Sequence, residues 1–198
     1  ESNITASVVE SAITSVGVTD DMRDTYLGAF TEVHEEVYDT NNFNWQMNIG
    51  KVFKAEVKGW HKKSASRILA RKNVHPEIAY HSSSMQPLPN ILFNSLKIGP
   101  MASANKAGRQ YRIYCEGAHR RHCALQTYLL FHQVPAINPG LLFAVEYELL
   151  VDRNPDSCDS LTVRKQWITK EADHALTSVR IYVINYFKIL DDNARGKY

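Results

Sequence analysis

The sequence predicts an α+β fold, with an antiparallel sheet core flanked by helices and preceded by an N-terminal helical segment. Apolar residues recur with the helical period in the first 40 residues and alternate with polar residues in several later segments. The size agrees, because 198 residues with 44% hydrophobic composition can form a core without metals or disulfides. We therefore divide the chain into an acidic helical arm, 1–40, and a single α+β core domain, 41–198.

Two helices are expected in the acidic helical arm. Residues 7–16 place apolar side chains at helical spacing, and Gly17 follows where a helix would stop. Thr19 or Asp20 then begins a second helix that extends to residue 39. We expect the apolar stripe of this second helix to pack on another copy of the chain. The residues proposed for self-association are Met22, Tyr26, Phe30 and Val33.

Alternation of apolar and polar residues predicts the strands of the core domain. A hairpin is expected over 43–57, with its turn at 48–51, followed by a short basic helix over 62–72. Ala65, Ile68 and Leu69 would form the inward side of that helix. Four prolines then indicate a loop-rich stretch, 76–100.

The second half of the chain is richer in Tyr, Val, Ile and Leu, which favours strands. Strands are expected over 110–116, 124–132, 141–152 and 178–190, and a helix from 160 to about 176. In 141–152, Glu146 and Glu148 lie on the opposite side from the apolar residues, which predicts one solvent-exposed face.

The charge distribution is strongly asymmetric. The first 40 residues contain nine acidic residues and one basic residue, Arg23, a net charge of −8. Because the whole chain carries +2, the remainder carries +10. Such a division is typical of an acidic arm on a body attracted to polyanions.

The densest charge cluster lies between residues 51 and 72, where eight basic residues accompany one acidic residue, Glu56. At roughly 1 kcal/mol per basic residue near an anionic leaflet, several together could hold a protein on a membrane. The cluster could equally bind RNA phosphates or nucleoprotein, or be a solvated helix face balanced by the acidic arm. Trp60 could be an interfacial anchor or a core residue. The candidate residues are Lys51, Lys54, Lys58, Trp60, Lys62, Lys63, Arg67, Arg71 and Lys72, with a second basic patch at Arg109, Arg112, Arg120 and Arg121.

The sequence does not favour an enzyme. It contains no P-loop, GxGxxG, GxSxG or HExxH motif, and we assign no catalytic residue, metal ligand or cofactor. Cys115, His119, His122 and Cys123 do lie close together, so a zinc site or a small metal enzyme there stays an alternative, although the spacing is unusual for zinc. The odd number of cysteines, three, indicates a reducing compartment.

Several short features occur in an order that suggests a family. They are 89–97 (PNILFNSLK), 111–117 (YRIYCEG) with His119 and His122 behind it, 138–152 (NPGLLFAVEYELLVD), an acidic turn and Trp167. This order resembles the matrix proteins of rhabdoviruses, small peripheral proteins beneath the viral envelope, and covers about 43–190. The chain departs from the family in starting with acidic helices rather than a Lys-rich arm and in lacking PPxY and PTAP motifs. Either a trimmed N-terminus or a distant branch such as the plant viruses would account for these departures.

The resemblance implies an α+β core and a structural protein that self-associates and bridges the nucleocapsid to the anionic inner face of the envelope during assembly and budding. Its partners would be further copies of itself, viral nucleoprotein, the anionic membrane surface and RNA. Its location would be the virion beneath the envelope and the host cytoplasm and membranes, with the nucleus as a further compartment. The alternative is a jelly-roll coat or movement protein that binds nucleic acid directly. The sequence leaves open which basic patch meets lipid and which meets nucleocapsid.

Overall fold

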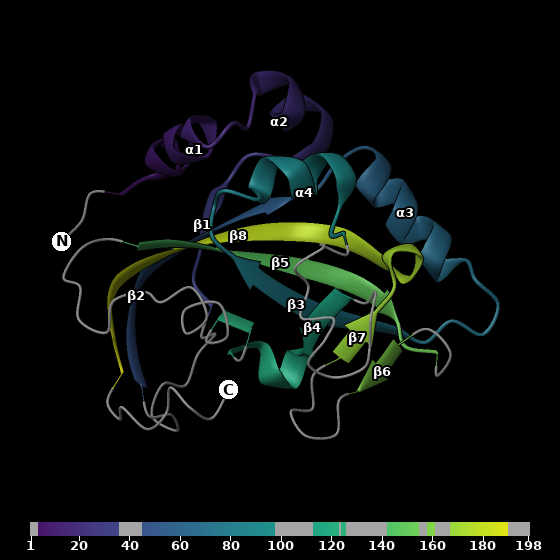
Figure 1. The fold of residues 1–198 in the computed structure, drawn as a ribbon. Coiled ribbons are helices and arrows are strands. Elements are labelled where there is room, and N and C mark those ends of the chain that lie inside the picture. Colours follow the sequence, from purple (N-terminus) through teal and green to yellow (C-terminus); the bar gives the residue numbers. More distant parts are fainter. Residues whose placement is uncertain are drawn as a thin grey trace.

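The computed structural model describes residues 4–35, 45–97, 113–122, 124–125, 142–154, 158–160 and 167–189. Within these residues, eight strands form one antiparallel sheet with the order β1-β2-β8-β5-β3-β4-β7-β6, accompanied by helices (Figure 1). The predicted α+β class is therefore confirmed. The strands are β1 Thr31–Val33, β2 Trp45–Glu56, β3 Pro76–Ser83, β4 Ile113–Gly117, β5 Leu142–Asp152, β6 Cys158–Ser160, β7 Trp167–Thr169 and β8 His174–Ile189. The helices are α1 Ala6–Ser15, α2 Asp20–Tyr26, α3 Trp60–Leu69, α4 Leu88–Asn94 and the short 3₁₀ turns η2 Ala118–Arg120 and η3 Glu171–Asp173.

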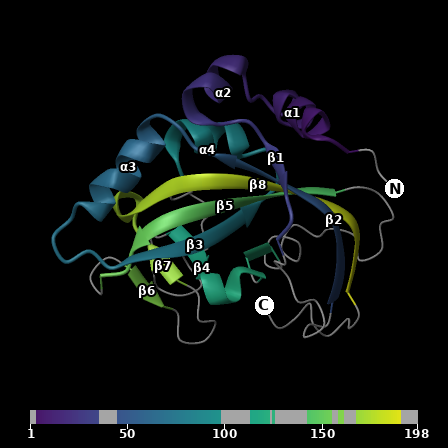
Figure 2. The ribbon, with the colours of Figure 1, turned by 180° about the vertical axis from the view of Figure 1, so that it is seen from behind.

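Helices α1, α2 and α4 lie over one face of the sheet, as Figures 1 and 2 show from opposite sides. Alternate residues of the central strands point toward these helices, including Val145, Tyr147 and Leu149 of β5 and Val179 and Ile181 of β8, all fully buried. The period-two pattern in the sequence thus produces one continuous core between sheet and helices. At the start of β8, α3 packs in a smaller cluster formed by Ile68, Leu150, Ala175 and their neighbours.

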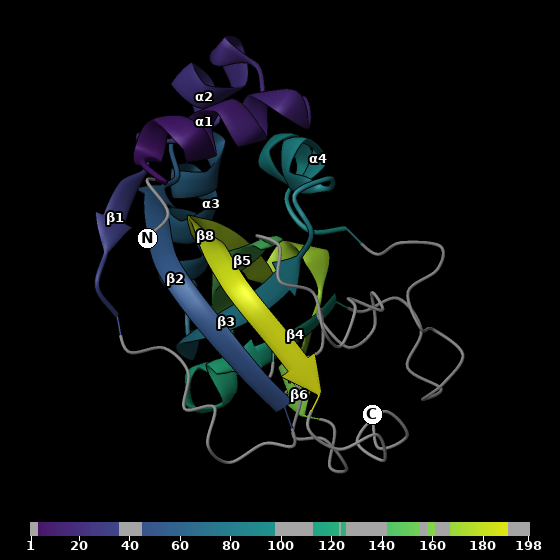
Figure 3. The ribbon, with the colours of Figure 1, turned by 90° about the vertical axis from the view of Figure 1, so that its left-hand side faces the viewer.

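The N-terminal helices belong to this core. Val9 and Ile13 of α1, Leu27 after α2, and Phe30 are buried in the same cluster as the central strands. Figure 3 shows α1, α2 and α4 stacked on the same side of the sheet. The described part of 1–40 is therefore packed on the domain rather than free of it.

The predicted helix over 19–39 is wrong beyond Tyr26. Thr19 caps α2 as expected, since its side chain accepts a hydrogen bond from the Met22 N–H at 3.1 Å. The backbone then becomes extended at Leu27, which bridges to Val57, and β1 pairs with β2. Pairing with a strand distant in the sequence overrides the local helical spacing.

The predicted hairpin over 43–57 is also wrong, because β2 continues through the expected turn at 48–51. It pairs with β8 along its whole length, and the register only shifts around Ile49. The segment 48–51, with its glycine, therefore forms an irregularity within one continuous strand and not a turn between two strands.

Further predictions are confirmed or corrected in part. The strands expected at 110–116, 141–152 and 178–190 correspond to β4, β5 and β8. The helix expected over 160–176 is wrong, because its described parts are the end of β6, β7, η3 and the start of β8, and the loop-rich stretch 76–100 contains β3 and α4. Of the strand expected at 124–132, Ala124 and Leu125 are helical and the rest lies outside the described residues.

The second face of β5 is not solvent-exposed as predicted. Glu146 does point away from the apolar residues, but it is fully buried. The sequence pattern therefore placed Glu146 on the correct side of β5, but the prediction that this side is exposed to solvent is wrong for Glu146.

Candidate interaction surface

Helix α3 is positioned by the turn that precedes it. After β2, the Lys58 N–H donates to the Tyr26 carbonyl at 2.8 Å, and Gly59 has φ +65°. A Cβ at Gly59 would lie 2.7 Å from the Thr25 carbonyl oxygen, so this turn requires glycine. Contact with α2 thereby sets where α3 begins.

The spacing of apolar residues sets which side of α3 faces the protein. His61 and Ile68 are buried and Ala65 is half-buried, whereas Lys62, Lys63 and Arg67 are exposed. Leu69, which the sequence placed inward, is 53% exposed. A cationic side of α3 therefore faces solvent.

The eight bases of the predicted patch divide into two groups. Three have carboxylate partners: Lys51 lies 3.9 Å from Glu32, Lys54 lies 3.2 Å from Glu56, and Arg71 contacts Asp152 and Asp173. Such pairs reduce the charge available to an outside partner. The other five are exposed and form no ion pair with a carboxylate in the described ranges: Lys58, Lys62, Lys63, Arg67 and Lys72.

Aromatic rings connect α3 to α4. Trp60, half-buried, stacks on His61 with ring centroids 3.9 Å apart, and Tyr26 lies edge-on to His61 at 5.9 Å. Tyr26 also contacts Phe93 of α4 at 6.3 Å, and Phe93 is 60% exposed. Tyr26 therefore links the exposed phenyl ring of α4 to His61 of α3, the helix whose outer side carries the exposed cations. We call this region the α3–α4 surface: Lys58, Trp60, Lys62, Lys63, Arg67 and Phe93.

The described members of the second basic patch, Arg120 and Arg121, do not form an exposed cationic surface. Arg120 lies 3.5 Å from Glu116, and the Arg121 side chain is only 15% exposed and bonded to carboxylates. Arg109 and Arg112 lie outside the described residues. In the structure Arg120 and Arg121 are instead paired with the buried carboxylates of Glu116 and Glu146.

The residues proposed for self-association lie mainly within the chain's own packing. Phe30 is 4% exposed in the main core, and Met22 and Tyr26 pack against that core. Val33 is half-buried in β1. The exposed side of α2 is instead acidic, with Asp20, Asp21 and Asp24.

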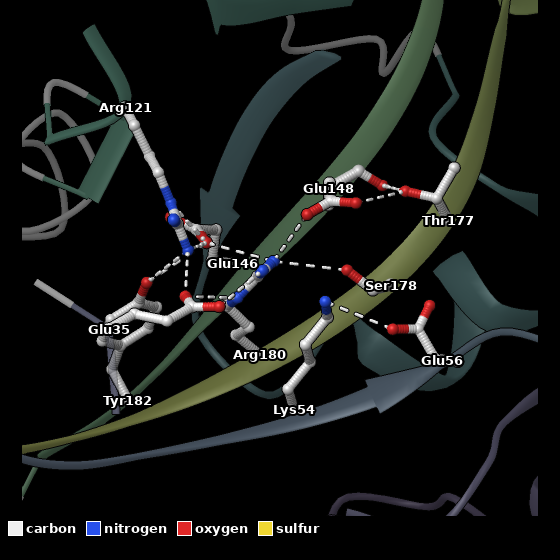
Figure 4. Close-up of polar contacts among 10 residues, drawn as sticks. All are labelled: Glu35, Lys54, Glu56, Arg121, Glu146, Glu148, Thr177, Ser178, Arg180 and Tyr182. Carbon is white, nitrogen blue, oxygen red and sulfur yellow. Dashed lines mark hydrogen bonds and ion pairs between the residues drawn. The ribbon is translucent and has the colours of Figure 1, made fainter. Parts of the chain in front are cut away.

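The sequence reasoning missed a charge network on the second face of the sheet (Figure 4). Glu146 accepts hydrogen bonds from Arg121 Nε to both carboxylate oxygens at 3.0 Å and from the Tyr182 hydroxyl at 3.2 Å. Arg180, 3% exposed, donates to Glu148 at 2.9 Å and pairs in a bidentate manner with Glu35 at 3.0 and 3.1 Å. These residues join β5, β8 and the segments around 35 and 121.

The arginines keep the outer carboxylates of this network ionised. Burial acts to raise the pKa of Glu148, but the hydrogen bond and charge of Arg180 outweigh burial, and the pKa lies below its ordinary value. The pKa of Glu35 is lowered by the same balance. A carboxylate held ionised by arginines is poorly suited to proton transfer near neutral pH. The network therefore fits a structural role.

The described residues contain no cluster of ligands for a metal ion. Cys115 is buried in the main core, and Cys123 lies outside the described residues. The ring of His119 lies 6.1 Å from that of Trp167. Among the helices that the structure describes, none is long and apolar enough to span a bilayer.

Comparison with known proteins does not assign the chain to a family. No family model matches the chain, and no curated protein matches it either.

Proposed function

We propose that this chain is a non-enzymatic, matrix-type structural protein that docks on anionic membrane through the α3–α4 surface and self-associates there, linking the membrane to nucleoprotein. The observation that carries the proposal is the set of exposed cations on one side of α3, which have no carboxylate partner among the described residues, together with the exposed ring of Phe93 on the neighbouring helix α4. Lipid headgroups attract the cations, and the region between headgroups and acyl chains accepts aromatic rings. The location that follows is the inner face of an envelope or a host membrane.

The estimated attraction of one copy to the membrane is modest, which favours docking by several associated copies at once. The four exposed bases of the α3–α4 surface, at roughly 1 kcal/mol each, provide about 4 kcal/mol, which resembles the weak, reversible binding given by one acyl chain. Phe93 adds at most about 2 kcal/mol when its ring is buried. Several linked copies would bind much more tightly than one, because each further contact is intramolecular. Self-association and membrane docking therefore support each other.

The acidic side of α2 is a candidate for contact with another copy. Asp20, Asp21 and Asp24 are exposed there, so they are available to basic side chains of another copy outside the α3–α4 surface, which the membrane occupies. Opposite charges steer association even where they add little affinity. This replaces the apolar stripe expected from sequence, which the chain uses for its own packing.

A coat or movement protein of the jelly-roll class is less well supported. A jelly roll packs two sheets face to face, whereas the described strands form one sheet covered by helices. Binding of RNA by the same cations stays a competing outcome, because phosphates attract them as well.

Vesicle flotation tests the proposal. The wild-type chain and the variant Lys58→Glu, Lys62→Glu, Lys63→Glu are mixed with neutral or anionic vesicles at low salt. We expect binding to anionic vesicles only, and at least about 100-fold weaker binding for the variant, from about 3 kcal/mol of lost attraction. The control, Lys51→Glu with Lys54→Glu, changes bases that are already paired and should lose less.

Two outcomes would count against the proposal. Equal binding to neutral and anionic vesicles would remove the electrostatic basis. Retention on single-stranded RNA at a salt concentration where anionic vesicles are not bound would favour the nucleic-acid function.

A further inference from the structure

Helix α4 is held on the sheet by apolar contacts and by two histidines. Its residues Leu88, Ile91 and Leu92 are buried against the rest of the chain, whereas Phe93 faces solvent. The helix ends at Asn94, and the next residue, Ser95, is buried and has a positive φ, +61°, with ψ −174°. For a residue with a side chain this conformation is strained, so the surrounding contacts must hold it.

His61 of α3 contacts the middle of α4. Its Nε2 lies 2.6 Å from the Leu92 carbonyl oxygen, and a carbonyl can only accept, so Nε2 carries the hydrogen. The other ring nitrogen, Nδ1, is then unprotonated. It is buried and has no hydrogen-bond partner among the described residues. A proton added to this ring would therefore create a buried N–H facing no described acceptor.

His174 of β8 contacts the end of α4. Its Nδ1 lies 3.1 Å from the Lys170 carbonyl oxygen and therefore donates. Its Nε2 lies 3.0 Å from Ser95 Oγ and must accept the Ser95 hydroxyl hydrogen. The ring is 5% exposed. A proton on Nε2 would remove that acceptor and force Ser95 to reverse its hydroxyl.

The surroundings of both rings disfavour positive charge. Tyr26 of α2 and Trp60 present uncharged rings to His61, and His174 adds repulsion if it is charged. Near His174, Lys97 and Glu171 have opposing effects and are paired with each other at 3.2 Å. Burial is the largest effect and lowers the pKa of both rings below the ordinary 6.5, although their hydrogen bonds to backbone carbonyls act in the opposite direction.

We propose that His61 and His174 form a proton-sensitive clamp, which holds α4 on the sheet while both rings are neutral and weakens when they bind protons. The clamp acts on α4 itself and does not depend on what binds the α3–α4 surface. Because α4 carries Phe93, acid would also change the part of that surface that Phe93 forms.

The direction of the pH effect follows from proton linkage. A ring with a lowered pKa binds a proton more readily when α4 is open than when it is closed. The closed state is therefore fully favoured above about pH 6.5 and loses its advantage as the pH falls below that value. Each ring can raise the opening constant by at most about tenfold per pH unit.

Hydrogen exchange of the α4 amides measures this opening directly. Protection factors, corrected for the intrinsic exchange rate, are compared at pH 7.5 and 5.5 in the intact chain. We expect them to fall in α4 by about 3- to 100-fold, while those of β5 change less. The variant His61→Gln, His174→Gln keeps polar side chains that do not titrate and should lose the pH dependence. His75→Gln, at an exposed histidine, should behave as the wild type does.

A second measurement on the wild type keeps the proposal testable if the double variant does not fold. Ring-nitrogen NMR should show hydrogen on Nε2 of His61 and on Nδ1 of His174 at pH 7.5. Trp60 fluorescence should be quenched as the stacked His61 gains its proton. Unchanged α4 protection between the two pH values, or both rings titrating at 6.5 while α4 stays protected, would overturn the clamp.

Discussion

Arg180 is the residue on which the buried network depends most. It pairs with Glu148 and Glu35 and lies 3.8 Å from the fully buried Glu146. We expect Arg180→Met to lower the free energy of unfolding by about 3–5 kcal/mol, because it leaves buried carboxylates without this cation. Urea denaturation measures the change. The matched control, Arg67→Met on the exposed side of α3, should change stability by no more than about 0.5 kcal/mol. Equal changes in the free energy of unfolding for both substitutions would show that the buried network does not stabilise the fold more than an exposed arginine does.

Glu148 predicts a separate acid effect. Since its pKa in the folded chain lies below 4.5, its stabilisation is present above pH 4.5 and lost as the pH falls below that value. Glu148→Gln removes this contribution. The difference in unfolding free energy between wild type and variant should therefore shrink as the pH falls below about 4.5. Glu77→Gln, at an exposed position of β3, is the control. A difference that does not change with pH would contradict the assignment.

For single residues, the sequence predicted which side of a strand a side chain lies on better than it predicted the groups that surround that side chain. Alternation placed Glu146 opposite the apolar residues of its strand, which is correct. Its burial depends on Arg121, 25 residues away in the chain, and on Arg180 from another strand. No local pattern shows that two arginines will meet one glutamate. Likewise, the basic run from Lys51 to Lys72 could not reveal which members have carboxylate partners.

Among the elements, the start of α3 depends most clearly on one residue. Gly59→Ala should lower the free energy of unfolding by about 1–3 kcal/mol, because its Cβ would clash with the Thr25 carbonyl and φ is positive. Ser66→Ala, on the exposed part of α3, should change stability by less than about 0.5 kcal/mol. Thermal unfolding of both variants provides the comparison. A Gly59→Ala chain as stable as Ser66→Ala would mean that the turn can shift without cost.

Helices and strands were predictable where the spacing of apolar residues in the sequence matched the side that is buried in the structure. β5, β8 and α3 have long, regular patterns and were found from sequence. The helix expected at 160–176 failed because Trp167, Ile168 and Thr169 are buried by pairing with β4, far away in the chain. The helix expected to reach residue 39 failed for a similar reason, since β1 pairs with β2. The Gly28 N–H donates to the Glu56 carbonyl at 2.7 Å, two residues after the end of α2.

For the whole molecule, the packing of the N-terminal helices changes how self-association must be tested. Removing 1–40 would take Val9, Ile13, Leu27 and Phe30 out of the main core. Such a truncation would confound lost assembly with lost stability. Substitutions on the exposed side of α2 avoid this problem.

We expect Asp20→Asn, Asp21→Asn, Asp24→Asn to reduce the average mass measured by light scattering at low salt, since the variant lacks the charges proposed to steer one copy onto another. Raising the salt should reduce the wild-type mass as well. Glu77→Gln, an exposed acid elsewhere, is the control. An unchanged mass distribution in the triple variant would exclude α2 from the contact between copies.

The most direct measurement of the central claim places a reporter in the α3–α4 surface. Phe93→Trp keeps an exposed aromatic ring at the outer side of α4, and its fluorescence is taken as the difference from wild type. With anionic vesicles we predict a blue shift and quenching by brominated lipid, neither of which should occur with neutral vesicles. A chain that binds anionic vesicles while the residue at 93 stays in water would contradict docking through this surface.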